Sequence, residues 1–146
     1  MKIYLDVCAI QRPLDTPTHL RIVLESDAVL GLLALSERGQ IALVSSEALE
    51  YEVRQNPNSL RREYALAVLR QAQEHLRISD AVEKRAEELT RHGFKALDAL
   101  HLALAEAGQV DYFCTTDDRI LKRARRLATL RVKVVSPLEL AEEFES

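Results

Sequence analysis

Two aspartates directly follow apolar runs that have the pattern of buried strands. Asp6 comes immediately after Ile3–Leu5, and Asp117 comes two threonines after Tyr112–Cys114. In an open parallel sheet, ligands bind outside the carboxyl ends of the strands. Acids at these positions are therefore candidates for a binding site, unlike acids on solvated faces. If the two strands are parallel neighbours, we expect the two carboxylates to share one edge of the sheet.

Two further acids lie on predicted helices that begin at the same edge, because helices in such folds run antiparallel to the strands. Asp98 lies near the start of the alanine- and leucine-rich segment Lys95–Ala107. Glu52 lies about 9 Å along a helix that begins at Ser46, and its longer side chain can reach back. The sequence therefore predicts that four carboxylates from distant segments meet.

Four carboxylates held together must either bind protons or collect cations. Oxygen ligands of this kind suit Mg²⁺ or Mn²⁺. Such ions activate water, stabilise a leaving oxygen and neutralise phosphoryl charge, which is the chemistry of metal nucleases and phosphatases.

Each acid also has a structural explanation that the sequence leaves open. Asp98 in a first turn can complement the helix dipole, and Asp117 can be the N-cap of the next helix. Glu50 lies close to Glu52, and a surface glutamate on a helix is common. Asp6 is harder to explain in this way, because a carboxylate that ends a buried strand must find donors.

The order of predicted elements defines the fold class. The predicted strands are Ile3–Leu5, Ile41–Ser45, Asp111–Thr115 and Arg131–Val135, and the predicted helices are Leu20 to before Gly39, Ser46–Arg54, Leu60–His75, Ala81–His92, Lys95–Ala107, Asp117–Leu127 and one capped by Ser136 and Glu139. Strands separated by helices, without a hairpin signal, indicate a parallel sheet covered on both faces. We expect an α/β fold, a three-layer α/β/α sandwich with a short, mostly parallel sheet, as a single domain over residues 1–146.

Two of these helices are predicted mainly from the spacing of their apolar residues. The helix predicted over Leu60–His75 includes Tyr64, Val68 and Ala72 at helical spacing. In the helix predicted from Leu20 to before Gly39, the side chains expected to face the core are Leu20, Val23, Leu24, Ala28, Leu32 and Leu35.

Composition limits the class of protein. The chain has 146 residues, 47% of them hydrophobic and 29% charged, which fits one globular domain. Two cysteines and no visible signal peptide favour a reducing cytoplasm, and no apolar run approaches the length of a membrane span. The net charge of −3 argues against binding nucleic acid by overall positive potential. Cations bound by an acidic cluster would weaken that objection.

Four segments together resemble the PIN domain, including the VapC-type toxins of prokaryotic toxin–antitoxin pairs. They are YLDVC at Tyr4–Cys8, VSS and its following glutamates at Val44–Glu52, KALDALHLALA at Lys95–Ala105 and CTTDDRIL at Cys114–Leu121. The resemblance spans the chain to about Pro137. It implies a ribonuclease that depends on Mg²⁺ or Mn²⁺ and has a pocket of four carboxylates.

The resemblance assigns the site position by position. The first acid of the family matches Asp6, the helical glutamate Glu52, the third acid Asp98 and the acid of the T-x-D element Asp117. All four are expected to be catalytic, and the three aspartates are expected to bind the metal. Thr115 matches the hydroxyl residue of the T-x-D element and is expected to support the site.

The chain also departs from the family pattern. Cys8 stands two residues after the first acid, where the family often has Thr, Ser or Asn, so a hydroxyl or amide is lost there. Glu50 competes with Glu52, and Asp118 competes with Asp117. Asp118 is therefore kept as a supporting residue of the site.

Other polar residues are secondary candidates. Arg12 and Arg119 are candidates for binding substrate phosphates, and Arg119 belongs to a basic helix that also carries Lys122, Arg123, Arg125 and Arg126. A solvated basic face is the alternative for that helix. His101 lies three residues after Asp98 on the same helix face, either as a proton shuttle or supporting partner or as a plain core histidine.

We therefore expect an endoribonuclease that uses a metal-activated water, with RNA as substrate. An antitoxin protein and a second copy of the chain are the candidate partners. The alternative is a catalytically weak PIN-like module that binds RNA or protein. Retention of all four acids favours the enzyme, and RNA binding without cleavage would favour the module.

Overall fold

The computed structural model describes residues 1–144, and within them one sheet of five parallel strands forms the centre of the fold. The strand order is β3-β2-β1-β4-β5. The strands are β1 (Lys2–Leu5), β2 (Ala42–Ser46), β3 (Glu74–Leu76), β4 (Tyr112–Cys114) and β5 (Lys133–Val135).

Strand β1 lies at the middle of the sheet and is covered on both faces. Ile3 pairs with Leu43 of β2 on one side and with Tyr112 of β4 on the other. Ile3 and Tyr4 are fully buried, and the Tyr4 ring stacks on Phe113 with 5.2 Å between centroids. A strand buried on both faces reads as a continuous apolar run, which is why the sequence revealed it.

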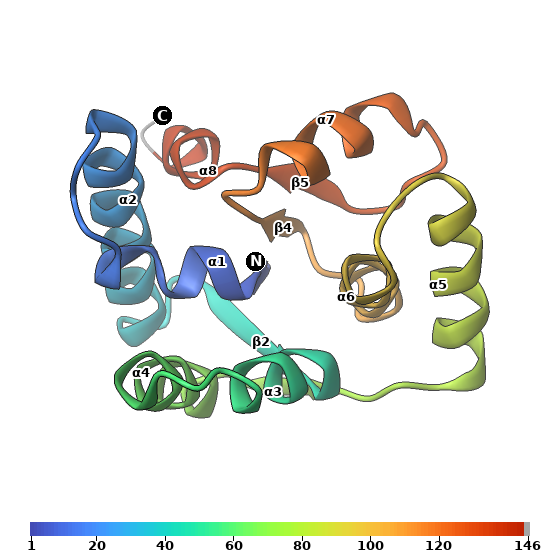
Figure 1. The fold of residues 1–146 in the computed structure, drawn as a ribbon, viewed down its shortest axis with the longest axis horizontal. Coiled ribbons are helices and arrows are strands. Elements are labelled where there is room, and N and C mark those ends of the chain that lie inside the picture. Colours follow the sequence, from blue (N-terminus) through green and yellow to red (C-terminus); the bar gives the residue numbers. More distant parts are fainter. Residues whose placement is uncertain (145–146) are drawn as a thin grey trace.

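Helices cover both faces of the sheet, as a three-layer α/β/α sandwich requires. Figure 1 shows α2 on one side of the strands and α6 on the other, with α5 packed outside α6. The helices are α1 (Val7–Ile10), α2 (Leu20–Glu37), α3 (Glu47–Arg54), α4 (Ser59–Arg70), α5 (Asp80–Arg91), α6 (Ala96–Ala107), α7 (Asp118–Arg126) and α8 (Pro137–Glu143), with a 3₁₀ turn at Arg12–Leu14. The predicted fold class is confirmed.

Serine caps mark the starts of two helices, and the cap at Ser136 was predicted. Ser79 accepts a hydrogen bond from the Val82 amide at the start of α5, and Ser136 forms a capping box with Glu139 at the start of α8. These local signals depend on neighbouring residues alone, so the sequence placed the helix starts well.

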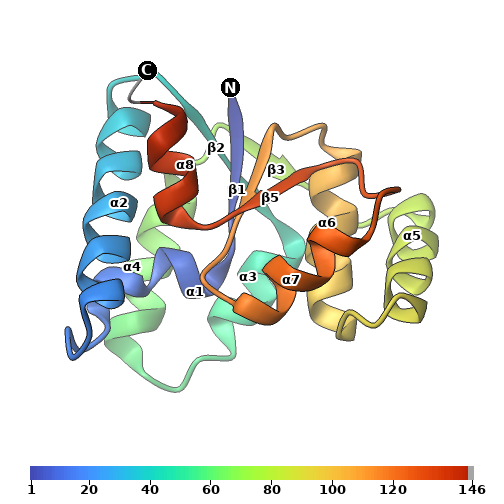
Figure 2. The ribbon, with the colours of Figure 1, turned by 90° about the horizontal axis from the view of Figure 1, so that it is seen from above.

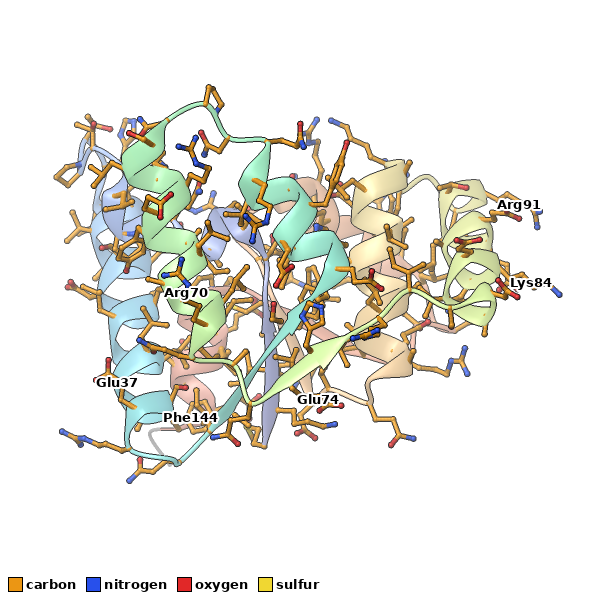
Figure 3. All side chains as sticks on the ribbon, turned by 90° about the horizontal axis from the view of Figure 1, so that it is seen from below. Glu37, Arg70, Glu74, Lys84, Arg91 and Phe144 are labelled. Carbon is orange, nitrogen blue, oxygen red and sulfur yellow. The ribbon has the colours of Figure 1, made fainter. Side chains whose placement is uncertain are left out.

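The predicted helix Leu60–His75 is wrong after Arg70. The chain leaves α4 there and forms β3, in which Glu74 pairs with Val44 of β2. Figure 3 shows β3 beside β2, with Glu74 labelled on it. A three-residue edge strand with one buried side chain, Leu76, is too short to give a periodic signal, and pairing with β2 determines its conformation.

The buried face predicted for α2 is also wrong in part. Leu20 is 72% exposed and Leu24 is 43% exposed, whereas Glu25, Val29 and Leu32 are buried. Apolar residues occupy more than one side of this helix, so their spacing does not select a single face. The side of α2 that packs inward is the one that carries the buried Glu25. Its carboxylate pairs with Arg12, which lies outside the helix, so the spacing of apolar residues could not reveal this side.

The described helices are too short or too polar to cross a bilayer.

Candidate metal centre

Side chains from three elements meet where β1 ends. Single ligand atoms of Asp6, Glu52 and His101 all lie within 4.8 Å of one another. Figure 2 shows β1 running from the N-terminus toward the end of the molecule at which α1, α3 and α7 lie. The topology therefore gathers residues separated by up to 95 positions at the carboxyl edge of the sheet.

Asp6 is held by donors on both carboxylate oxygens. Its Oδ1 accepts from the Val7 amide at 2.9 Å, and its Oδ2 accepts from Thr115 Oγ1 at 2.8 Å. The side chain is 5% exposed, and this burial raises its pKa, while the hydrogen bond from Thr115 opposes the rise. Thr115 thus supports the carboxylate, at the place that the sequence assigned to it.

Cys8 contributes a neutral sulfur to the same group. Its Sγ lies 3.3 Å from Asp6 Oδ2 and 3.3 Å from Thr115 Oγ1. Burial, followed by the Asp6 charge, raises the pKa of the Cys8 thiol to about 12. The group therefore stays protonated and donates weakly to Asp6, in place of the lost hydroxyl or amide.

Glu52 is positioned by a buried chain of hydrogen bonds. His101 Nε2 lies 2.8 Å from Glu52 Oε1, and Nδ1 lies 2.6 Å from the Tyr4 hydroxyl. The Tyr4 hydroxyl lies 2.7 Å from Ser46 Oγ, which also accepts from the Leu49 amide.

The network assigns one tautomer to His101. A carboxylate only accepts, so Nε2 carries a proton and donates it to Glu52. Nδ1 of the neutral ring then accepts from Tyr4, whose oxygen accepts from the Ser46 hydroxyl. With this direction of donation, each side chain from Ser46 through Tyr4 and His101 to Glu52 has a hydrogen-bond partner. His101 therefore acts on Glu52, and its Nε2 donates to that carboxylate instead of offering a lone pair to a metal.

The structure separates Glu52 from its competitor on the same helix. Glu50 Oε1 lies 3.9 Å from His75 Nδ1 of β3, and Glu50 is not part of the cluster. The two residues are two positions apart, so α3 directs them to different sides.

Asp98 lies in the first turn of α6 and interacts with the cluster through its charge. Burial raises the pKa of the half-buried Asp98 to about 6, followed by repulsion from Asp6, with Asp117 and Glu52 adding to the rise. The four predicted acids therefore share one electrostatic environment.

Asp117 and Asp118 have different surroundings. Asp117 is the N-cap of α7, and its Oδ1 accepts from the Arg119 amide at 2.9 Å. Asp118 instead forms a bidentate ion pair with Arg21 of α2, at 2.8 and 3.0 Å. Arg21 also donates to the Thr116 carbonyl, so this pair ties the turn that carries Asp117 to α2.

The two arginines proposed as phosphate ligands also differ. Arg12 donates to the buried carboxylate of Glu25 at 2.7 Å and to Asp15 at 2.9 Å, so its guanidinium is engaged within the protein. Arg119 is 72% exposed, with its Nε 3.6 Å from Asp117 Oδ1. Only Arg119 of the two presents a guanidinium at the surface beside the acids.

We expect Asp98→Asn to raise the free energy of unfolding of the metal-free protein at pH 7.5. A pKa raised from 3.8 to about 6 means that the ionised Asp98 costs stability at neutral pH. Because Asp98 is only partly buried, solvent screening reduces the gain from the variant to about 1 kcal/mol. Urea unfolding in EDTA measures it.

The same experiment has a pH dependence of known sign. The folded protein prefers protonated Asp98, so the wild type recovers this stability as the pH falls through about 6. The gain of the variant should therefore vanish below about pH 4, the unfolded pKa. A large loss of stability in Asp98→Asn at neutral pH would contradict this account and make Asp98 a structural cap.

Comparison with known proteins agrees with the doubly covered parallel sheet. The sequence model of the PIN domain matches residues 13–127, most of the chain. The protein therefore belongs to the PIN domain family. The matched range begins after Asp6, so the place of Asp6 in the cluster rests on the geometry described above.

A solved structure shares the fold at low sequence identity. A chain from the crystal structure of VapBC2 from Rickettsia felis, bound to a DNA fragment from their promoter, superposes with a TM-score of 0.60. The identity is 14%, and the match covers 93% of this chain and 98% of that chain. No curated protein sequence matches.

Proposed function

We propose that this protein is an endoribonuclease that depends on Mg²⁺ or Mn²⁺. One observation carries the proposal: in a member of the PIN family, Asp6 and Glu52 meet at the carboxyl edge of the sheet, and burial together with repulsion from Asp6 raises the pKa of Asp98 to about 6. Carboxylates that repel one another in this way, with oxygen ligands only, fit a hard divalent cation.

Asp6, Asp98 and Asp117 are the residues that hold the ion in this proposal. When bound, the ion supplies stabilisation of phosphoryl charge and activation of water. Thr115 and Cys8 keep the Asp6 carboxylate in place by donating to Oδ2. Oδ1 accepts only from the Val7 amide among the described residues, so it retains a second lone pair for a cation.

Glu52 orients the attacking water. Its Oε1 is occupied by the His101 donor, whereas no donor within residues 1–144 contacts Oε2. The side chain is about one-third exposed, which leaves Oε2 free to accept a hydrogen bond from water in this proposal. A water that donates to Oε2 has one lone pair directed away from Glu52, toward the phosphorus.

Cleavage by water leaves a recognisable product. The 2′-hydroxyl of RNA is not the nucleophile, so the products carry 5′-phosphate and 3′-hydroxyl ends. The test is incubation with a mixed RNA pool in Mg²⁺, Mn²⁺ or EDTA, with end-group analysis. Cyclic 2′,3′-phosphate ends, or full activity in EDTA, would contradict the proposal. Tight RNA binding by metal-loaded protein without cleavage of RNA or DNA would favour the binding module.

A protein partner of the antitoxin kind is the second part of the proposal. The likeness to a chain of the VapBC2 complex supports it, and so does the surface of α2, which exposes Leu20, Val23, Leu24 and Leu30. A hollow of about 320 Å³ between α2 and α4 adjoins this surface. A small open reading frame beside the gene would supply the partner, and a second copy of the chain is the other occupant to test.

A further inference from the structure

A basic hollow lies between the end of α5 and helix α7, beside the acidic cluster. Its volume is about 290 Å³, and it is lined by His92, Arg119, Lys122, Arg123, Arg126 and Leu127. We call this feature the α7 hollow. Four cationic side chains therefore line one concavity in a chain whose net charge is −3.

Three of the four cations of the α7 hollow have no counterion among the described residues. Within residues 1–144, no carboxylate lies within 4.0 Å of the charged nitrogens of Lys122, Arg123 or Arg126. By contrast, Arg85 pairs with Glu106 at 2.7 Å, and Arg125 of the same helix pairs with Glu139 at 2.7 Å. Like charges gathered without counterions create a positive potential that attracts an anion.

A second hollow links the α7 hollow to Asp98. This smaller hollow, of about 150 Å³, shares Arg119 and Arg123 with the α7 hollow and is lined by Asp98. At Gly93, between α5 and α6, a Cβ atom would overlap the Arg123 guanidinium. The positive φ of 95° at Gly93 also suits glycine, so the backbone leaves room for Arg123 between the two hollows.

We infer that the α7 hollow binds the sugar–phosphate backbone of a nucleic acid strand whose neighbouring phosphate lies at Asp98. The inference rests on the proposed function and adds the path that the substrate takes. Arginine guanidinium groups bind phosphate oxygens through paired N–H donors, and lysine adds a point charge. His92 supplies the only ring at the α7 hollow, so backbone contacts dominate and the binding is largely independent of sequence.

The test compares two charge-matched double variants of the full chain. Lys122→Gln with Arg126→Gln removes two cations from the α7 hollow. Arg125→Gln with Arg131→Gln removes two cations that lie outside it and are paired with Glu139 and Glu106, respectively. Each is made in the Asp6→Asn background to prevent cleavage, and anisotropy of a fluorescein-labelled single-stranded RNA 12-mer gives Kd across a range of NaCl concentrations.

We expect the Lys122/Arg126 variant to weaken RNA binding about tenfold or more at low salt. Its slope of log K against log salt should fall in magnitude by about 1.4, because each single-strand phosphate contact contributes about 0.7. The Arg125/Arg131 variant should change Kd less than about twofold. Equal loss in both variants would overturn the inference in favour of general charge, and an unchanged slope in the Lys122/Arg126 variant would overturn it as well.

The outcomes also separate this inference from the proposed nuclease. RNA cleavage by the wild type, together with unaltered RNA binding by the Lys122/Arg126 variant, overturns the path along α7 and leaves the nuclease intact. Selective loss of binding in that variant, with no cleavage by metal-loaded wild type, supports the α7 hollow and contradicts the nuclease.

Discussion

Asp6→Asn should lower the rate of metal-dependent RNA cleavage by at least about two orders of magnitude. Asp6 is the most buried of the predicted acids and leads from the central strand into the cluster. Asparagine has nearly the same shape and still accepts from the Val7 amide, so the fold should survive. The variant removes one negative charge and one oxygen ligand, which a divalent cation needs.

Glu50→Gln is the matched control for this prediction. It also removes one carboxylate charge, from the helix that carries Glu52, but Glu50 lies by His75 outside the cluster. We expect cleavage within about a factor of two of wild type, and circular dichroism of both variants should match wild type. If Asp6→Asn kept more than about a tenth of the wild-type cleavage rate, Asp6 would not be a catalytic residue.

The sequence predicted where Asp6 and Asp117 lie because local signals determine both. Each follows an apolar run, and a run without polar alternation indicates a strand buried on both faces. Leu5 pairs with Cys114 in the structure, so Asp6 lies beside Thr115 at the same edge. Only the pairing of β1 with β4 had to be assumed, and the fold class made it plausible.

The support of Glu52 could not be predicted, because it depends on contacts between distant residues. Tyr4 reads as an apolar strand residue, yet its hydroxyl binds His101, which is 97 positions away. Of the interpretations of His101, the structure favours a supporting partner, because the ring is fully buried and donates to Glu52. Cys8 likewise reads as a core thiol and lies instead against Asp6.

Buried charge explains the remaining errors of interpretation. Glu25 lies on the packed side of α2, where the apolar spacing predicted leucines, because Arg12 and Arg21 both reach its carboxylate. Arg12 was a candidate for binding substrate phosphate, and its guanidinium is instead engaged by this pairing with Glu25. The ion pair between Arg12 and Glu25 leaves no periodic pattern in the sequence, because it forms only when the two elements pack together.

The most direct test of the central claim is whether a divalent cation binds at the acidic cluster. Thermal unfolding is measured with and without MnCl₂ for the wild type and for Asp6→Asn with Asp98→Asn, with Glu50→Gln as control. A ligand that binds only the folded state stabilises it by about 2.7 kcal/mol at a concentration of 100 Kd. For a domain of this size that corresponds to a rise in Tm of about 5–10 °C.

We predict this rise in Tm for the wild type and for Glu50→Gln, and no rise for the Asp6/Asp98 double variant. The double variant should unfold cooperatively in EDTA, because removing two repelling carboxylates relieves strain in the metal-free cluster. An equal rise in Tm for the double variant and the wild type would contradict the site, and so would the absence of any rise in the wild type at millimolar Mn²⁺.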